Sequence, residues 1–237
     1  MQQNSKLDQN NVHLWSIWIP DLLPELPNFL CLLNQEEQQR AERFRFATHR
    51  ERFIIARGML RNILSLYVDL SPSDITFSLG THGKPYLENN PLQIQFNLSH
   101  SNDTILYAMT QGSDIGIDIE KIEEKFNRAV AKRFFSAEEN RQLSMLPASD
   151  RIKCFFRIWA GKEAIIKMLG VGLYTALNEF SIHLHQDKQI ILIDDRQYYL
   201  EHCDIYSGYQ SAFAVSSPIQ DVKRWQWTLE GPREIIF

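Results

Sequence analysis

The sequence predicts an α+β protein with two lobes, and two observations support this class. After one opening strand pattern in the first half, each half of the chain places helical patterns before strand patterns, so helices and strands are segregated instead of alternating. The chain has 237 residues, of which 44% are hydrophobic, which is enough for one large core or two smaller ones. We place the first lobe at residues 1–112 and the second at residues 113–237.

The first half opens with a strand pattern at residues 13–19, and three prolines in residues 20–27 then predict an irregular connection. Asn34 followed by Glu37 has the form of a capping box and predicts a helix start. A second helix is predicted over residues 53–67 by apolar side chains at three-to-four spacing. Short strand patterns separated by turn residues follow at residues 75–79, 94–98, 105–110 and 115–120.

The second half has the same order of elements. Ser136 with Glu139 again has the form of a helix cap, and a long helix over residues 150–169 can end at Gly170. An internal duplication would explain the shared order, and a chance similarity of the two caps is the alternative. Strand patterns then follow at residues 180–184, 190–193, 198–205 and 211–216.

Composition argues against several classes of protein. A net charge of −4 does not fit a general nucleic-acid binder. The polar start at residues 1–11 lacks the apolar run of a secretory signal, and no stretch reaches the roughly 18 apolar residues of a membrane span. Three cysteines lie far apart without metal-site spacing, which indicates reduced thiols. We therefore expect a cytoplasmic protein without nucleic-acid or membrane partners.

The strand pattern at residues 115–120, Ile-Gly-Ile-Asp-Ile-Glu, is the most informative hexapeptide. Side chains alternate along a strand, so the isoleucines share one face, and Gly116, Asp118 and Glu120 share the other. Two carboxylates on one face need a cation, a proton or contact with water, and hard oxygen ligands of this kind suit Mg²⁺ or Mn²⁺. This pattern taken alone favours the simpler alternative, a solvated acidic face.

A third carboxylate lies on the helix predicted over residues 150–169. Trp159, Glu163 and Lys167 are four residues apart and form one stripe. On an open surface Glu163 and Lys167 would form an ordinary pair worth about 0.3–0.5 kcal/mol. The helix faces beside the stripe are apolar, so we expect these two side chains to be partly buried, as in a functional site.

An arginine-rich segment precedes these motifs. Residues 40–61 carry seven arginines and two glutamates, a local charge of +5 in a chain of net charge −4. Arginine binds phosphate through two parallel hydrogen bonds, so the segment is a candidate cradle for an anion. The alternative is an ordinary charged helix face.

Four motifs in series resemble the signature of Sfp-type phosphopantetheinyl transferases. They are Gly83-Lys84-Pro85, Phe96-Asn97-Leu98-Ser99-His100-Ser101, residues 116–120 and residues 159–167. Their order and spacing fit this family, and Arg133-Phe134-Phe135-Ser136 between them is also similar. The likeness covers roughly residues 36–172.

The resemblance implies two similar lobes related by a pseudo-two-fold axis, each with helices on a small, mostly antiparallel sheet, and an active site between the lobes. It also implies an enzyme that transfers 4′-phosphopantetheine from its co-substrate coenzyme A to a serine hydroxyl of an apo acyl or peptidyl carrier protein. Adenosine 3′,5′-bisphosphate is the implied leaving group. Mg²⁺ is the implied cofactor, with Mn²⁺ as an alternative, and the implied form is a monomer.

The same resemblance assigns roles to individual residues. Asp118, Glu120 and Glu163 would hold the metal ion. Glu163 is also the candidate general base, directly or through a metal-bound water, and Lys167 would contact the transferred phosphate. His100 joins Glu163 and Lys167 as a catalytic candidate. The residues implied in binding coenzyme A are Arg40, Arg45, Arg52, Lys84, Pro85, Ser99, His100, Lys162 and Lys167.

Two features leave details of this assignment open. Glu37 stands where the family often has a basic residue, and Phe53 stands where a small hydroxyl residue can stand.

Basic side chains in residues 121–133 are a candidate docking surface for an acidic carrier protein. Glu123 and Glu124 dilute that charge, however, and favour an ordinary solvated segment.

Two other classes of function remain as alternatives. A Mg²⁺-dependent hydrolase or nuclease would use a similar set of carboxylates and a lysine. A non-catalytic module that binds coenzyme A or a carrier protein would keep the fold without the reaction. The presence of all three carboxylates and Lys167 argues against the non-catalytic module.

Overall fold

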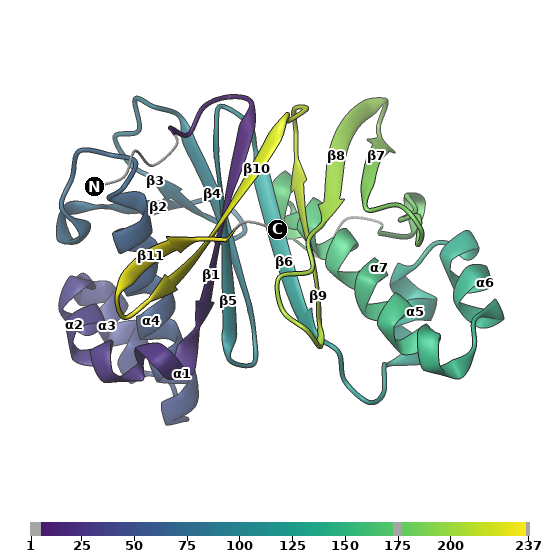
Figure 1. Ribbon diagram of the computed structural model, residues 1–237, viewed down its shortest axis with the longest axis horizontal. Helices are drawn as coiled ribbons and strands as arrows, with labels where there is room; N and C mark the ends of the chain where they lie inside the picture. Colours follow the sequence, from purple (N-terminus) through teal and green to yellow (C-terminus); the bar gives the residue numbers. More distant parts are fainter. Residues whose placement is uncertain (1–5, 173–176, 236–237) are drawn as a thin grey trace.

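The computed structural model describes residues 6–172 and 177–235, so residues 1–5 of the polar start lie outside the described part of the chain. Helices lie at the two outer ends of the molecule, and most strands lie between them (Figure 1). Each lobe packs helices against a small, mostly antiparallel sheet, which confirms the predicted fold class. Within the described residues, no helix is both long enough and apolar enough to cross a membrane.

The first sheet combines strands from both ends of the chain. Its strands are, in spatial order, β11 (Gly231–Glu234), β10 (Asp221–Thr228), β1 (Asn11–Trp18), β5 (Thr104–Gln111) and β4 (Ile94–Ser101). β10 pairs with β1 in parallel, and the other neighbours are antiparallel. β10 and β11 follow the proposed lobe boundary at residue 112, yet they lie in the first sheet.

The helices of the first lobe share one apolar core with this sheet. The capping box predicted at Asn34 and Glu37 is confirmed, with each side chain bonded to the backbone N–H of the other. The second predicted helix starts earlier than expected, at Ala47. The elements are α1 (Ile19–Leu22), α2 (Leu26–Leu32), α3 (Gln35–Glu42), α4 (Ala47–Leu64) and the two-stranded ribbon of β2 (Phe77–Leu79) and β3 (Pro85–Leu87).

The three prolines in residues 20–27 begin helical segments, and the predicted irregular connection is wrong. A proline occupies the first or second position of α1, of the 3-10 helix Leu23–Glu25 and of α2. A helix needs no backbone N–H at its first positions, and proline already has a helical φ. Proline spacing therefore marks helix starts in this segment.

The second lobe is built on the antiparallel sheet β6-β9-β8-β7, against which α7 packs. Ser136 and Glu139 form the predicted capping box, and Gly170 ends α7 with a φ of 67°. The strands are β6 (Ile115–Lys121), β7 (Lys188–Ile193), β8 (Arg196–His202) and β9 (Tyr209–Val215), and the helices are α5 (Arg128–Phe134), α6 (Ala137–Met145), α7 (Ala148–Leu169) and the 3-10 helix Leu177–Glu179.

The strand predicted at residues 180–184 is wrong, because side chains bind the backbone there. The Glu139 carboxylate accepts the N–H of Ile182 at 2.7 Å. The Gln189 side chain accepts the N–H of His183, also at 2.7 Å. These bonds use the N–H groups that a strand would offer to a neighbouring strand.

Edge strands β4 and β6 meet at the junction between the lobes. Side chains alternate along β4, so Asn97, Ser99 and Ser101 point to one side, and each bonds to β6. The bonds are Ile117 N–H to Asn97 Oδ1 at 2.9 Å, Ser99 Oγ to Asp118 Oδ1 at 2.8 Å, and Lys121 N–H to Ser101 Oγ at 3.0 Å. Three polar residues of one motif thus join the two sheets.

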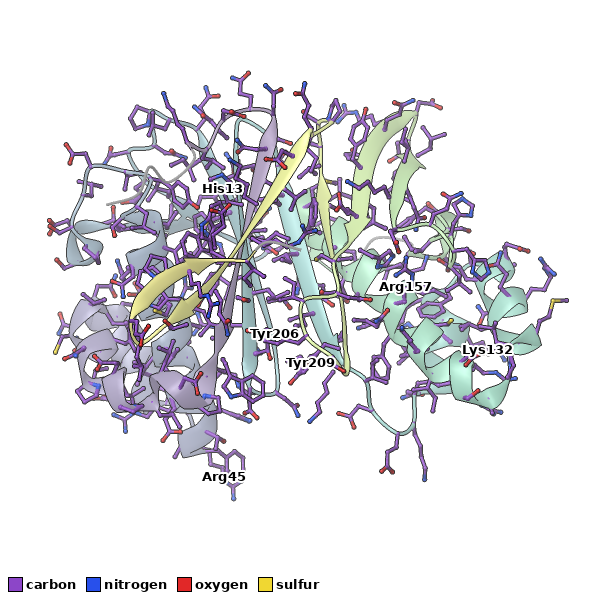
Figure 2. The ribbon with its side chains drawn as sticks, viewed as in Figure 1. His13, Arg45, Lys132, Arg157, Tyr206 and Tyr209 are labelled. Carbon is purple, nitrogen blue, oxygen red and sulfur yellow. The ribbon has the colours of Figure 1, made fainter. Side chains whose placement is uncertain are left out.

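An apolar layer completes the junction. The buried isoleucines of β6 pack in one cluster with Leu14 and Leu106 of the first sheet. Tyr206, near the middle of Figure 2, lies against Trp18 of β1 with ring centroids 6.2 Å apart. The two lobes are therefore held together by apolar contacts as well as by hydrogen bonds.

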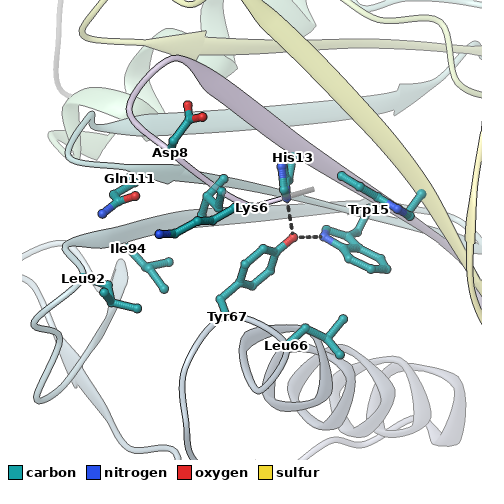
Figure 3. A pocket seen from close by; sticks show the side chains of 11 residues that line it. Lys6, Asp8, His13, Trp15, Leu66, Tyr67, Leu92, Ile94 and Gln111 are labelled. Carbon is teal, nitrogen blue, oxygen red and sulfur yellow. Dashed lines mark hydrogen bonds between the residues drawn. The ribbon is translucent and has the colours of Figure 1, made fainter. Parts of the chain in front are cut away.

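The chain after α4 is anchored to the first sheet by the hydroxyl of Tyr67. This hydroxyl accepts a hydrogen bond from the Trp15 indole at 2.7 Å and lies 2.9 Å from His13 Nδ1 (Figure 3). Burial lowers the pKa of His13 to about 4, so its ring is neutral at pH 7. A cavity of about 400 Å³ opens beside this group, and none of the predicted site residues lines it.

Candidate active site at the lobe junction

Strand β6 presents its carboxylates to α7. Gly116, at the start of this face, lies against the last turns of the helix. A Cβ atom on Gly116 would lie 2.1 Å from the carbonyl oxygen of Ala164, so only glycine allows β6 and α7 to approach this closely. Asp118 and Glu120 follow on the same face and meet side chains of α7.

Asp118 is the most buried of the three carboxylates, with 3% of its surface exposed. Its Oδ1 accepts hydrogen bonds from Ser99 Oγ at 2.8 Å and from the Lys167 ammonium at 2.6 Å. Lys167 also donates to Ser99 Oγ at 2.9 Å. These contacts join β4, β6 and α7 in one polar cluster.

Glu120 and Glu163, the other two carboxylates, have fewer neighbouring groups that stabilise their negative charge. Burial, followed by the charge of Asp118, raises the pKa of Glu120 to about 7, although Lys167 and a hydrogen bond from Trp159 Nε1 at 3.1 Å act against the rise. Burial and the charge of Asp118 also raise the pKa of Glu163. Lys167 alone does not balance three carboxylates, and a further cation would lower both pKa values.

The donor set fits a divalent metal ion. Within the described residues no three acidic, histidine or cysteine side chains already form a metal site. The Oδ2 atom of Asp118 is nevertheless buried and has no hydrogen-bond partner among the described residues. Carboxylate oxygens with unmet charge are the ligands that Mg²⁺ takes in proteins.

Two cavities meet beside this cluster. The first, of about 270 Å³, is lined by Glu163 and Lys167 together with the loop at residues 82–85. The second, of about 370 Å³, is lined by arginines and histidines of the first lobe. Pro85 and Leu98 line both cavities, so the two are adjacent, and we refer to them together as the groove.

The second cavity has the chemistry of an anion site. It is lined by Arg40, Arg52 and Arg57, with His100 at its edge. Arg52 Nε and Arg57 Nη1 are buried and lack hydrogen-bond partners among the described residues. Although much of His100 reaches solvent, partial desolvation lowers its pKa, with smaller contributions from Arg52 and Lys167. Guanidinium groups with free donors suit a phosphate.

Two residues of the arginine segment lie apart from this cavity. Arg45 is exposed, lies over the ring of Phe46 and projects outward from the first lobe (Figure 2). Arg61 is buried and bonds to Glu37 at 2.5 Å. Glu37, the acidic departure from the family pattern, thus orients arginines of α4, since Arg57 also lies 3.8 Å from it.

Two predicted lysines bind backbone oxygens of the protein. Lys162 is completely buried, pairs with Glu139 at 2.9 Å and donates to two carbonyl oxygens in the second lobe. Lys84 donates to three carbonyl oxygens at the start of β6 and the end of α7. Contact of either lysine with coenzyme A stays a prediction.

Sequence reasoning did not assign several residues that the structure brings to the site. Arg57 and His49 line the anion cavity, and Trp159 bonds to Glu120. The density of arginines at residues 40–61 was the only signal for Arg57, and no spacing singled out His49. The stripe that Trp159 shares with Glu163 indicates on which face of the helix Trp159 lies. It does not indicate that Trp159 bonds to Glu120.

Comparison with known proteins gives one consistent answer. A family model described as the 4′-phosphopantetheinyl transferase superfamily matches residues 114–216. A second, described as 4′-phosphopantetheinyl transferase, N-terminal, matches residues 16–112.

Curated relatives agree with these matches. The 4′-phosphopantetheinyl transferase HetI of Nostoc sp. is 38% identical over 184 residues, which cover 76% of this chain and 77% of HetI. The 4′-phosphopantetheinyl transferase Sfp of Bacillus subtilis is 32% identical over 197 residues, which cover 82% of this chain and 87% of Sfp. The chain belongs to the 4′-phosphopantetheinyl transferase family.

Proposed function

We propose that Asp118, Glu120 and Glu163 bind Mg²⁺, or Mn²⁺ in its place, during the reaction of this family. The chain is a 4′-phosphopantetheinyl transferase that uses coenzyme A to modify a carrier protein. Asp118 Oδ2, which has no hydrogen-bond partner in the described part of the chain, and the pKa of Glu120 near 7 support a cation between these carboxylates. A bound Mg²⁺ would offset the negative charge of the coenzyme A pyrophosphate.

The groove of these two adjacent cavities is our candidate site for coenzyme A. Arg40, Arg52 and Arg57 line its second cavity and would supply guanidinium groups for the 3′-phosphate. Its other cavity would then receive the pyrophosphate beside Glu163 and Lys167. His100 lies at the arginine end, where a neutral imidazole can still donate a hydrogen bond to a phosphate oxygen.

The reaction needs a proton acceptor and positive charge near one phosphorus atom. The carrier serine oxygen attacks the phosphorus that carries the pantetheine arm, and the bond from that phosphorus to the bridging oxygen breaks. Adenosine 3′,5′-bisphosphate leaves with the bridging oxygen. Glu163, which lines the groove beside Lys167, takes the serine proton. Lys167, held by Asp118 and Ser99, stabilises charge on the phosphoryl oxygens.

Three features support the finer expectations about partners and location. Both halves of the groove come from one chain, which supports a monomer as the active form. The basic side chains of residues 121–133 are largely exposed beside β6, which supports docking of an acidic carrier protein there. The three cysteines, Cys31, Cys154 and Cys203, are free, which supports a reducing, cytoplasmic location.

One observation carries the proposal: a polar cluster of three carboxylates and Lys167 lies at one end of a groove whose other end is lined by three arginines. The test is to incubate the protein with an apo carrier domain, coenzyme A and Mg²⁺, and to weigh the carrier by intact-mass spectrometry. We expect a gain of one phosphopantetheine, lost with EDTA and restored by excess Mg²⁺. Free phosphopantetheine without carrier modification would favour a hydrolase, and no reaction with several carrier types would favour a non-catalytic module.

A further inference from the structure

The Lys84 ammonium group is fully occupied by the protein itself. It donates hydrogen bonds to three backbone carbonyl oxygens. These oxygens belong to Ile115 at 2.9 Å, Lys167 at 2.9 Å and Met168 at 3.3 Å. A lysine ammonium has three N–H donors, so these bonds leave none for a phosphate.

Two of these oxygens lie in the last turn of α7. Carbonyl groups in the last turn of a helix lack partners within the helix and carry its partial negative charge. The carbonyl of Ile166 is bonded to the N–H of Gly170 at 2.8 Å. The Lys84 ammonium donates to the next two carbonyl oxygens, those of Lys167 and Met168. Its positive charge also compensates the partial negative charge at the end of α7.

Lys84 reaches α7 from the other lobe. It lies in the loop between β2 and β3, which is closed by a bond from the Gly80 N–H to the Lys84 carbonyl at 2.9 Å. Gly83 takes a φ of 80°, which favours glycine, and its N–H bonds to the Gly80 carbonyl at 2.9 Å. These two hydrogen bonds fix the turn and the main chain of Lys84 at its end.

The same turn of α7 carries a predicted catalytic side chain. Lys84 binds the backbone oxygen of Lys167, while the ammonium of Lys167 bonds to Asp118 at 2.6 Å and to Ser99 at 2.9 Å. Lys84 thus fixes the main chain of the residue whose side chain reaches the site. Its third bond, to Ile115, ties that turn to the start of the carboxylate strand.

We propose that Lys84 is a positioning residue, which holds the last turn of α7 against β6 so that Lys167 faces Asp118. Lys84 then acts on the reaction through α7, and its ammonium group does not bind a phosphate of coenzyme A. The effect on turnover rests on the proposed role of Lys167, but the effect on α7 does not.

The test compares Lys84→Met with Lys84→Arg, and uses Lys188→Met, an exposed lysine outside the site, as control. For Lys84→Met we expect about a tenfold loss of kcat, a Kd for coenzyme A within about twofold of the wild-type value, and faster amide hydrogen exchange in residues 163–170. Lys84→Arg keeps the charge and donors and should recover most of the protection. Lys188→Met should leave all three quantities unchanged.

Two results would overturn the proposal. A Kd for coenzyme A raised about tenfold, with exchange in α7 unchanged, would show direct contact with the co-substrate. Unchanged exchange with unchanged kcat would show that the three hydrogen bonds of Lys84 do not position α7.

If Lys84→Met fails to fold, Tyr86→Leu is the second variant. It removes the ring 5.9 Å from the Lys84 ammonium, and amide hydrogen exchange in residues 163–170 is measured again. Absent transfer by the wild-type chain would count against the proposed function alone, since exchange in α7 is measured separately.

Discussion

At the scale of single residues, the charge of each carboxylate in the site depends on its burial and on the groups that it contacts. Asp118 is the deepest, and it has both the Lys167 ammonium and the Ser99 hydroxyl. Among residues 6–172 and 177–235, Glu120 has only the Trp159 indole as a hydrogen-bond donor, and burial raises the pKa of Glu120 to about 7. Because its pKa is about 7, Glu120 is partly protonated at neutral pH, and binding a cation should release a proton from it.

Replacing Glu163 by glutamine tests its role as proton acceptor. The change keeps the shape of the side chain and removes its charge and basicity. We expect coenzyme A binding to remain measurable while the rate of transfer falls about a hundredfold or more, because a positioned base contributes 10²–10⁴-fold. Isothermal titration and the mass assay measure the two quantities. Glu230→Gln, at an exposed position outside the groove and the docking segment, is the matched control. Near-normal turnover by the Glu163 variant would remove Glu163 from the mechanism.

His202 gives the fold a predictable sensitivity to acid. It is 7% exposed, and neither ring nitrogen has a hydrogen-bond partner among the described residues. Burial, with Arg157 second, lowers its pKa to about 3 from 6.5, so the unfolded chain takes up a proton first as the pH falls. Stability contributed by the neutral ring is complete above pH 6.5 and is lost on acidification toward pH 3.

His202→Leu should remove this dependence. Between pH 7.5 and pH 5, the free energy of unfolding should fall by about 2 kcal/mol less in the variant than in the wild type, at roughly 1.4 kcal/mol per pH unit. Urea unfolding at the two pH values measures the difference, and the exposed His185→Gln is the control. Equal losses in wild type and His202→Leu would place the proton uptake elsewhere.

At the scale of elements, the site depends on how closely one helix approaches one strand. α7 lies on β6 at Gly116, and a Cβ atom there would lie 2.1 Å from the Ala164 carbonyl oxygen and 2.3 Å from the Met168 nitrogen. Both are backbone atoms of α7, so no side-chain rotation relieves the contact. The helix would have to move, and Glu163 and Lys167 would move with it.

Gly116→Ala should therefore damage stability and the site together. We expect a loss of about 3 kcal/mol in the free energy of unfolding, at the upper end for an added methyl group in a packed interior. Transfer activity should fall further than the folded fraction explains. Gly208→Ala has open space around its Cβ and only the strain of a φ of 80°, so it should cost less, about 1 kcal/mol. Equal losses in the two variants would mean that the approach of α7 to β6 is not limiting.

At the scale of the whole molecule, local signals in the sequence were informative and long-range ones were absent. The two capping boxes and the strand at residues 115–120 depend on residues within one turn or one strand, and each was predicted. The direction of Lys84 and Lys162 was not predictable, because their partners are carbonyl oxygens that any residue supplies. β10 and β11 were missed, since β10 is stabilised by pairing with β1, about 200 positions earlier in the chain.

The return of β10 to the first sheet makes the last strands part of the first lobe's stability. Trp225, 4% exposed, stacks on Trp15 with ring centroids 5.1 Å apart. Removing residues 217–237 would expose that surface and leave β1 without its parallel partner. We expect the truncated chain to lose cooperative unfolding in urea. Near-ultraviolet circular dichroism measures this unfolding.

A single substitution keeps this prediction testable where the truncation gives no soluble protein. Trp225→Ala should cost about 3–5 kcal/mol, as for a large buried aromatic, whereas Trp227→Ala, at a partly exposed position, should cost less. The loss should appear in the unfolding of the first lobe, which hydrogen exchange in β1 and β5 reports. Fast exchange confined to the second lobe would instead support a division of the folding units at residue 112.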